Sequence, residues 1–191
     1  MSSFDLNSDK ESPQDSESCR IHLELADSSP RPTDIEQIEK VFWETSKNQA
    51  NTAQSFIDRW LHIFLESPSR LLVTAKSQGQ VVGYLVCEMK TKTAPRIWEE
   101  HKSLRLFEST LPPNDFAHFH MNVSPEFQGL GVGRKLLETL FKNLEERGET
   151  ELYVVTGAHA PNVSFYLAVG FERLETKRLG ESELLLLVRN L

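Results

Sequence analysis

The sequence has 191 residues, of which 39% are hydrophobic, which is enough for one domain with a sizeable core and short for two. The formal net charge of -7 argues against nucleic acid or an anionic membrane as the main partner, because a phosphate-binding face needs clustered Lys and Arg. An acidic balance also suits an enzyme that receives a cationic amine, although it is more often only a means to solubility.

The sequence contains no feature of a secreted or membrane protein. No apolar run approaches the roughly 18 residues of a membrane span, and the N-terminus lacks the basic and apolar regions of a signal peptide. The two cysteines, Cys19 and Cys87, are too few for a disulfide framework or a four-thiolate metal site. We therefore expect a reduced, cytoplasmic protein, with the nucleus as a second possibility.

The N-terminal residues 1–18 are rich in Ser, Asp and Glu and predict a disordered tail, since they cannot bury enough apolar surface to offset their ordering entropy. Residues 19–191 are expected to form a single domain. Alternating apolar and polar residues at Ile21–Leu25 predict its first strand.

Two helices are predicted next. Thr33 and Glu36 have the spacing of a capping box, which predicts a helix that runs to about Thr45. A second amphipathic helix is indicated by apolar residues at helical spacing, namely Phe56, Ile57, Trp60, Leu61 and Phe64.

A hairpin and an irregular insertion precede the middle of the chain. Strand-like runs at Arg70–Lys76 and Val81–Met89 flank the turn Ser77–Gln80, which predicts a hairpin. Residues 90–115 are irregular and are expected to hold one short helix and a functional role. Another strand is predicted at Phe116–Val123.

The C-terminal half continues with mixed elements. The predicted order is a helix through Leu136–Leu144 that stops near Gly148, a strand at Glu151–Thr156, a short helix from Pro161 to about Gly170, a strand from Phe171 and a last strand at Leu184–Val188. The sum is an α/β (α+β) domain in which helices and strands do not strictly alternate.

The segment Gln128-Gly129-Leu130-Gly131-Val132-Gly133 is the most informative of the chain. It joins a predicted strand to an amphipathic helix, so its glycines let the backbone approach a ligand and expose amides at a helix start. Such a place suits a phosphate or pyrophosphate. The P-loop pattern fails because Arg134 stands where its second glycine is needed, and the dinucleotide pattern fails because its last glycine is replaced by Arg134 or, counted from Gly131, by Leu136. The alternative is a glycine-rich turn with packing duties only.

This turn, preceded by Val123-Ser124-Pro125, resembles motif A of the GNAT acetyltransferases. The run Asn162-Val163-Ser164-Phe165-Tyr166, followed by Gly170-Phe171, resembles motif B of the same family. The resemblance implies the GNAT fold, a central mixed, mostly antiparallel sheet of about six to seven strands with helices on both faces. It also implies acetyl-coenzyme A as cosubstrate and no metal.

The resemblance implies a role for each matching position. Main-chain groups of Met121 and Val123 are expected to pair with the pantetheine arm, as an added strand pairs with a sheet edge. Asn162 is expected to hydrogen-bond the pantetheine, and Tyr166 to lie near the sulfur. The amides expected to bind the pyrophosphate are those of Gln128, Gly129, Leu130, Gly131, Val132, Gly133 and Arg134.

Acetyl transfer to an amine needs a neutral amine, a polarised thioester carbonyl and a proton for the departing thiolate. The resemblance makes the amide of Met121 or a neighbour the candidate for polarisation and Tyr166 the candidate acid. The alternative for Tyr166 is an aromatic that only packs on the sheet.

His118, His120 and Asn122 share one face of their predicted strand, one step before the glycine turn. They could bind or deprotonate an ammonium, or they could form a hydrogen-bonded polar seam beneath the insertion. A metal site lacks an evident third ligand beyond His101 or Glu88.

A histidine pair on this strand is also found in the arylalkylamine branch of the family, but one residue earlier, and such a slip reverses the facing. The run is more similar to the acetyltransferase-like domains of some proteins of the O-GlcNAcase group. Those domains have an acidic residue where Asn122 stands, and an amide cannot act as a base. His120 is therefore the first choice of base, with a water chain to Glu88 as the second.

The resulting hypothesis is an N-acetyltransferase that acts on a small-molecule or peptide amine, as a monomer or homodimer, with no nucleic acid or membrane partner. The alternative is a catalytically inactive, acetyl-coenzyme A-binding regulatory or interaction module.

Overall fold

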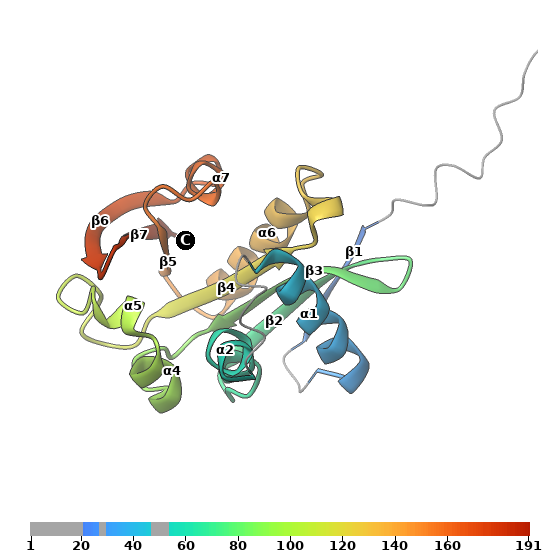
Figure 1. The fold of residues 1–191 in the computed structure, drawn as a ribbon, viewed down its shortest axis with the longest axis horizontal. Helices are drawn as coiled ribbons and strands as arrows, with labels where there is room; N and C mark the ends of the chain where they lie inside the picture. Colours follow the sequence, from blue (N-terminus) through green and yellow to red (C-terminus); the bar gives the residue numbers. More distant parts are fainter. Residues whose placement is uncertain (1–20, 27–29, 47–53) are drawn as a thin grey trace, which may run out of the picture.

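The computed structural model describes residues 21–26, 30–46 and 54–191, so the predicted tail and Cys19 lie outside the described residues. A seven-stranded sheet in the order β1-β2-β3-β4-β5-β7-β6 forms the centre (Figure 1). All neighbouring strands are antiparallel except β4 and β5. The strands are β1 (Ile21–Ala26), β2 (Arg70–Ser77), β3 (Gln80–Glu88), β4 (Ala117–Val123), β5 (Glu151–Gly157), β6 (Glu172–Leu179) and β7 (Ser182–Asn190). The predicted mixed, mostly antiparallel sheet is thereby confirmed.

Helices cover both faces of this sheet. In Figure 1 the helices α1, α2, α4 and α5 lie in front of the sheet, and α6 lies behind it. The helices are α1 (Pro32–Thr45), α2 (Gln54–Ile57), α3 (Ile63–Leu65), α4 (Pro95–Glu100), α5 (Lys102–Arg105), α6 (Val132–Glu146) and α7 (Asn162–Ala168). None of these described helices has the length and apolar character needed to cross a membrane.

The sheet separates the apolar core into clusters on its two faces. On one face, α6 buries an apolar stripe that includes Leu136, Leu140 and Leu144, each 0% exposed. This stripe packs on alternate residues of the strands, among them Cys87 and Phe119. The opposite face carries α1, α2 and α3 near the N-terminal strands. Phe119, Met121 and Val123 pack with the α6 cluster, whereas the His118 and His120 rings lie against Phe64 and Phe42 of the opposite face, which confirms the predicted facing of these β4 side chains.

The start of α1 differs from the predicted capping box. The N-cap is Arg31, whose carbonyl accepts from the amides of Asp34 and Ile35, and no side chain caps the helix. Proline at the first helical position explains this start, since it has no N–H to satisfy and holds the preceding residue extended. Thr33 therefore lies inside the first turn, and Thr33 and Glu36 form no capping box.

The second predicted helix is interrupted by a π-helical segment, Asp58–His62, between α2 and α3. Its signature is the Ile63 amide, which reaches back five residues to the Asp58 carbonyl. Leu61 and Phe64 are buried as the periodicity predicts, but Trp60 is 36% exposed. In the π-helical segment, Trp60 is thus only partly buried, unlike the core residues Leu61 and Phe64. The insertion 90–115 also differs, since it contains the two short helices α4 and α5 instead of one.

The sheet opens between its two central strands. β4 pairs with β3 along its length, from His118 opposite Glu88 to Val123 opposite Gly83. With β5 it pairs only at Ala117 and His118, opposite Leu152 and Tyr153. Beyond these pairs the strands diverge, and β5, β6 and β7 bend away from β1–β4 (Figure 1). The C-terminal part of β4 therefore has a second edge without a partner strand in the described chain.

Candidate active site

The open edge of β4 exposes the main chain of alternate residues. The amide of Ser124 donates to the carbonyl of Val82 in β3 at 2.9 Å. By the alternation of an antiparallel pair, the main-chain N–H and C=O groups of Asn122 and His120 also face β3. The N–H and C=O groups of Met121 and Val123 consequently face the opening. This is the orientation that an extended ligand needs in order to pair with the edge.

The glycine turn leaves a row of amides unengaged. Gly129 and Gly131 have φ values of 75° and 78°, which favour glycine, and Gly131 is the N-cap of α6. The first turn of α6 contains no acidic residue. Among the described residues, no acceptor takes the amides of Gly129, Leu130, Gly131, Val132, Gly133 and Arg134. Free N–H groups at the start of a helix can bind a pyrophosphate, and the first turn of α6 has no carboxylate that would repel it.

Gln128 differs from the other residues in the predicted row of phosphate donors. Its amide donates to the Pro125 carbonyl at 3.3 Å and closes the 3-10 turn Pro125–Phe127. Its side chain donates to the Val123 carbonyl at 2.9 Å. Both donor groups of Gln128 are thus engaged within the turn, unlike the amides that follow it, and the contact of its amide with a phosphate stays a prediction.

Two further residues of the turn have packing roles. A Cβ on Gly133 would lie 3.2 Å from the ring of Phe165, so this glycine lets α6 approach α7 closely. The guanidinium of Arg134 reaches the carbonyl of Ala168 in α7. The turn thus combines unengaged amides with packing contacts, and the packing alternative from the sequence applies to Gly133 and Arg134.

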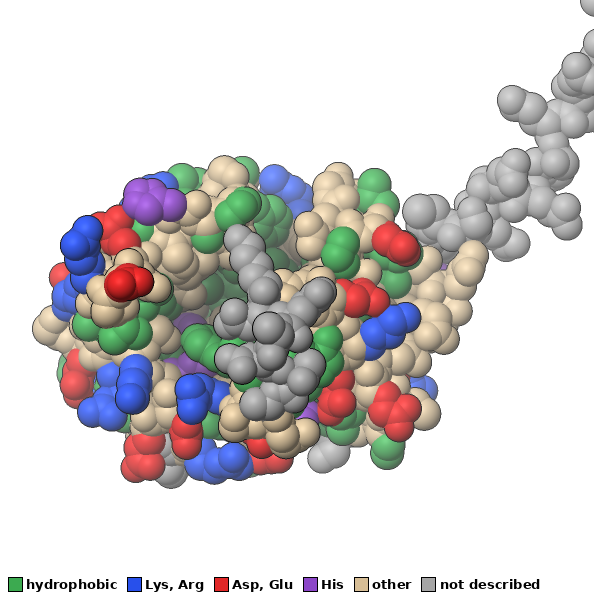
Figure 2. Space-filling view, viewed as in Figure 1, with side chains coloured by type: hydrophobic (Ala, Val, Ile, Leu, Met, Phe, Trp, Pro, Cys, Tyr) green, Lys and Arg blue, Asp and Glu red, His purple; other side chains and the backbone are tan. Residues whose placement is uncertain are grey.

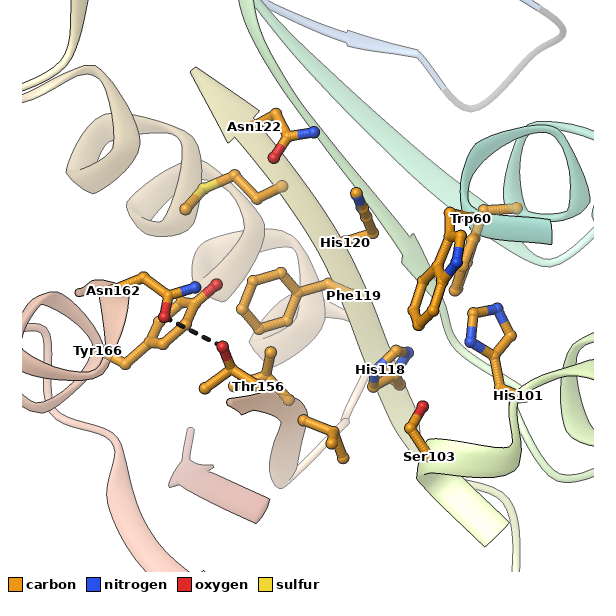
Figure 3. A pocket seen from close by; sticks show the side chains of 14 residues that line it. Trp60, His101, Ser103, His118, Phe119, His120, Asn122, Thr156, Asn162 and Tyr166 are labelled. Atoms are coloured by element: carbon orange, nitrogen blue, oxygen red, sulfur yellow. Dashed lines mark hydrogen bonds between the residues drawn. The ribbon is translucent and has the colours of Figure 1, made fainter. Parts of the chain in front are cut away.

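A cavity of about 190 Å³ lies in the opening between β4 and β5 (Figure 3). The lining residues come from both faces of the sheet: Trp60, Phe64, His101, Ser103, His118, Phe119, His120, Met121, Asn122, Val154, Val155, Thr156, Asn162 and Tyr166. The space-filling view shows the corresponding face hollowed, with a histidine visible inside (Figure 2). The split in the sheet therefore joins the α7 side to the α2–α3 side.

On the α7 side, the cavity receives the two predicted residues of the second motif. The Thr156 hydroxyl donates to Asn162 Oδ1 at 3.0 Å, which leaves the Asn162 amide nitrogen to donate elsewhere. Tyr166 is 5% exposed and packs edge-on against Phe119 and Phe171. Burial raises the pKa of Tyr166 well above its ordinary value, so the phenol keeps its proton.

On the other side, His120 and Asn122 both line the cavity but differ in whether they have a hydrogen-bond partner. The His120 ring stacks on Tyr84 with centroids 5.8 Å apart, and neither ring nitrogen has a partner among the described residues. Asn122 donates from its amide nitrogen to the Tyr84 hydroxyl at 3.0 Å. The hydrogen-bonded seam considered from the sequence therefore includes Asn122 and excludes His120.

Burial also decides what His120 can do. It lowers the pKa of His120 to about 4, with His101 adding a smaller repulsion. A ring with this pKa is a poor acceptor for the proton of an ammonium, but it remains a hydrogen-bond acceptor for a neutral amine. The geometry favours an orienting role over the predicted role of base.

The second predicted base, Glu88, does not line the cavity. Glu88 is 0% exposed and lies on the same face as His118, its partner in the β3–β4 register. One carboxylate oxygen already accepts from the Ser69 hydroxyl and the Lys90 amide, and the other has no partner among the described residues. His118, which does line the cavity, is the β4 residue directly opposite Glu88 in the register.

Sequence patterns did not assign Trp60, Phe64 or His101 to an acceptor site. The π-helical segment supplies Trp60, α3 supplies Phe64, and the insertion supplies His101. The Trp60 and His101 rings meet edge-on at 5.1 Å. Within the described chain, no group of three or more His, Cys, Asp or Glu residues could hold a metal ion. The one available signal was the presence of aromatic residues and a histidine in an irregular insertion.

Comparisons with known proteins agree with this architecture. The model of the acetyltransferase (GNAT) family matches residues 33–171. The [Ribosomal protein bS18]-alanine N-acetyltransferase of Salmonella typhimurium is 38% identical over 61 residues, 31% of this chain and 41% of that protein. The N-alpha-acetyltransferase RimI of Mycobacterium tuberculosis is 31% identical over 114 residues, 60% of each chain. The chain therefore spans less than two thirds of these relatives.

Solved structures share the fold at low sequence identity. The crystal structure of SsHAT has a TM-score of 0.64 at 23% identity and covers 88% of this chain and 98% of its own. A Thermoplasma acidophilum PaiA N-acetyltransferase in complex with coenzyme A has a TM-score of 0.58 at 14% identity, covering 89% and 99%. At these identities the likeness extends to the fold alone.

Proposed function

Since this chain belongs to the acetyltransferase (GNAT) family, we propose that it transfers the acetyl group of acetyl-coenzyme A to a primary amine by direct attack in a ternary complex. The observation that carries the proposal is the cavity between β4 and β5, which connects the two faces of the sheet. Two substrates can enter from opposite faces and meet in such an opening.

The cofactor side is supported by the unengaged groups of the chain. The amides from Gly129 to Arg134 bind the pyrophosphate at the start of α6. The main chain of Met121 and Val123 pairs with the pantetheine arm, and the Asn162 amide nitrogen donates to it. The Gln128 side chain already donates to the Val123 carbonyl. The pantetheine can therefore use the Val123 N–H and the second lone pair of that carbonyl.

The chemistry then needs few groups from the protein. The amine nitrogen attacks the thioester carbonyl, and the carbon–sulfur bond breaks. Tyr166 gives its proton to the departing sulfur, and the proton that the nitrogen loses returns through solvent to the Tyr166 oxygen, so the phenol is restored. The Met121 amide donates to the carbonyl oxygen as negative charge develops on it. Entry into the apolar cavity lowers the pKa of the amine, and His120 accepts a hydrogen bond from the neutral nitrogen.

The size of the cavity limits the acceptor. About 190 Å³ is smaller than the roughly 300–1,000 Å³ of pockets for drug-sized ligands. A small amine or the terminal residue of a peptide fits this space. The two relatives named above act, by their names, on an alanine of a ribosomal protein and on N-alpha groups, which supports the peptide terminus as one class.

Release of free coenzyme A thiol, measured against a panel of small amines and peptides with free N-termini, tests the proposal. We expect acceptor-dependent thiol release that is about 100-fold slower in Tyr166→Phe, without loss of coenzyme A binding. Binding of acetyl-coenzyme A without turnover on any acceptor would instead establish the inactive binding module.

A further inference from the structure

His101 and His118 form a pair of buried rings that the proposed chemistry does not use. They are 2% and 6% exposed, and their ring centroids lie 6.3 Å apart. His101 joins α4 to α5, whereas His118 lies on β4. Figure 3 shows both rings beside the same space, next to the Trp60 indole.

Each ring directs an unsatisfied nitrogen into a polar gap. His101 Nε2 and His118 Nδ1 are buried and have no hydrogen-bond partner among the described residues. His101 Nε2 and His118 Nδ1 are therefore the ring nitrogens that a ligand could satisfy. In a neutral imidazole one nitrogen donates and the other accepts, so a hydroxyl or carboxamide, which can do both, matches either tautomer. Buried polar atoms of this kind are costly unless something satisfies them.

The space around the pair is bounded by aromatic rings and neutral polar side chains and carries no formal charge. Trp60 and Phe64 contact the His101 ring edge-on, each with centroids 5.1 Å away. No Lys, Arg, Asp or Glu occurs among the described residues that line the cavity. The neighbouring Arg59 points its guanidinium to Glu100, 3.6 Å away. A ligand carboxylate or second ammonium would therefore be buried without a counter-charge.

We propose that His101 and His118 form a second polar subsite of the acceptor pocket, which binds an uncharged hydroxyl or carboxamide group of the acceptor. A hydroxyl can donate to His101 Nε2 and accept from His118, so one group satisfies both rings. This inference rests on the proposed acetyl transfer. The acceptor is then a primary amine that carries a neutral hydrogen-bonding group and no charge besides the amine.

The test compares acceptors that differ in one group. The free amines are 2-phenylethylamine and its 4-hydroxy, 4-carboxy and 4-aminomethyl derivatives. A parallel series of short peptides begins with Ser, Ala, Asp or Lys. For each acceptor, kcat/KM is measured by thiol release with the wild type, with His101→Phe and with His22→Phe, a control in the exposed part of β1. Calorimetric titration of the amines, in the presence of coenzyme A, measures binding without turnover.

In whichever series the protein uses, we expect the hydroxyl-bearing acceptor to have a higher kcat/KM than the unsubstituted and the charged acceptors. His101→Phe retains the ring packing and removes the ring nitrogens, so it should lower kcat/KM for the hydroxyl member about threefold to tenfold. The change should be in KM, with the unsubstituted member unaffected. The series that responds identifies the source of the group, a small molecule or a peptide terminus.

The proposal is overturned if the charged members are used equally well, or if His101→Phe and His22→Phe have the same profile. Equal kcat/KM values for the hydroxyl-bearing and the unsubstituted acceptors would also overturn it, because the gap would then hold only water. Absence of thiol release with every acceptor would contradict acetyl transfer alone. In that case, calorimetric binding of the hydroxyl amine that is weakened in His101→Phe would still support the subsite, and its absence would overturn it.

Discussion

The side chain of Gln128 donates to the main-chain carbonyl of Val123 at 2.9 Å, and this bond ties the glycine turn to the end of β4. It fixes the angle between the open strand edge and the first turn of α6. The two surfaces that are proposed to hold the pantetheine and the pyrophosphate are therefore held in register by one exposed amide.

Replacement of Gln128 by Ala should weaken coenzyme A binding about threefold to tenfold, the contribution of one hydrogen bond that organises the turn. Calorimetric titration with coenzyme A measures the change. Gln80→Ala, in the exposed turn of the hairpin, serves as a control of the same chemistry. Equal affinities of the two variants would mean that the turn is held by its glycines and its 3-10 helix alone.

Gly131 allows conformation and charge to be separated. Gly131→Ala places a Cβ in open space at a φ of 78°, so it should cost about 1 kcal/mol of stability and affect binding modestly. Gly131→Glu adds the same strain and a carboxylate at the proposed phosphate site, and should abolish coenzyme A binding. Thermal unfolding and titration of both variants measure the two effects. Retained binding in Gly131→Glu would remove the phosphates from this turn.

Tyr166→Phe should lower turnover about 100-fold, in line with the loss of a general acid. Coenzyme A affinity should change little, because phenylalanine retains the ring contacts with Phe119 and Phe171. Stopped-flow or steady-state thiol release gives the rate, and titration gives the affinity. An unchanged rate would reduce Tyr166 to a packing residue.

Buried histidines should make the protein sensitive to acid. Burial lowers the pKa of His101 and of His120 from 6.5 to about 4, so the unfolded chain binds protons that the folded protein refuses. Their stabilising contribution is complete above pH 6.5 and is lost as the pH falls toward 4. The loss is about 3 kcal/mol for one such ring. Urea unfolding from pH 7 to 4.5 should reveal it, with a shallower slope in His120→Phe than in His22→Phe.

His62 should show the opposite pH dependence. Its two ring nitrogens contact Asp58 Oδ1 at 2.8 Å and Glu39 Oε1 at 2.7 Å, which joins α1 to the π-helical segment. These carboxylates raise the pKa of His62 against the opposing effect of burial. The stabilisation is fully present below about pH 6.5 and is lost as the pH rises through the raised pKa. His62→Gln should cost about 1 kcal/mol or less at pH 6, and less at pH 9. A cost that does not vary with pH would exclude the ion pairs.

The elements that the sequence predicted well are those specified by local patterns. The hairpin, the strand ending at Val123 and the apolar stripe of α6 follow from alternation and helical spacing, and the glycine turn follows from its residues. Asn162 and Tyr166 were placed by resemblance, and the structure brings them to the same cavity as Met121 and His120. Their roles in binding and catalysis remain predictions.

What could not be predicted depends on contacts distant in sequence. The π-helical turn that exposes Trp60 is held by an interaction between His62 and Glu39, 23 residues apart. His101 reaches the cavity only because the insertion folds over the C-terminal strands. The pKa of His120 depends on how completely its neighbours bury it, which no pattern along β4 reveals. These features argue against His120 as the base, and its role in the chemistry stays a prediction.

The two residue pairs that join β4 to β5 leave the sheet one strand short along the rest of this boundary. On the proposed mode of binding, the pantetheine arm takes the place of that missing strand, so the bound cofactor completes the sheet. The stability of the fold then follows the free concentration of coenzyme A by mass action. A cell depleted of both coenzyme A and its thioester would therefore contain this chain in its least stable form.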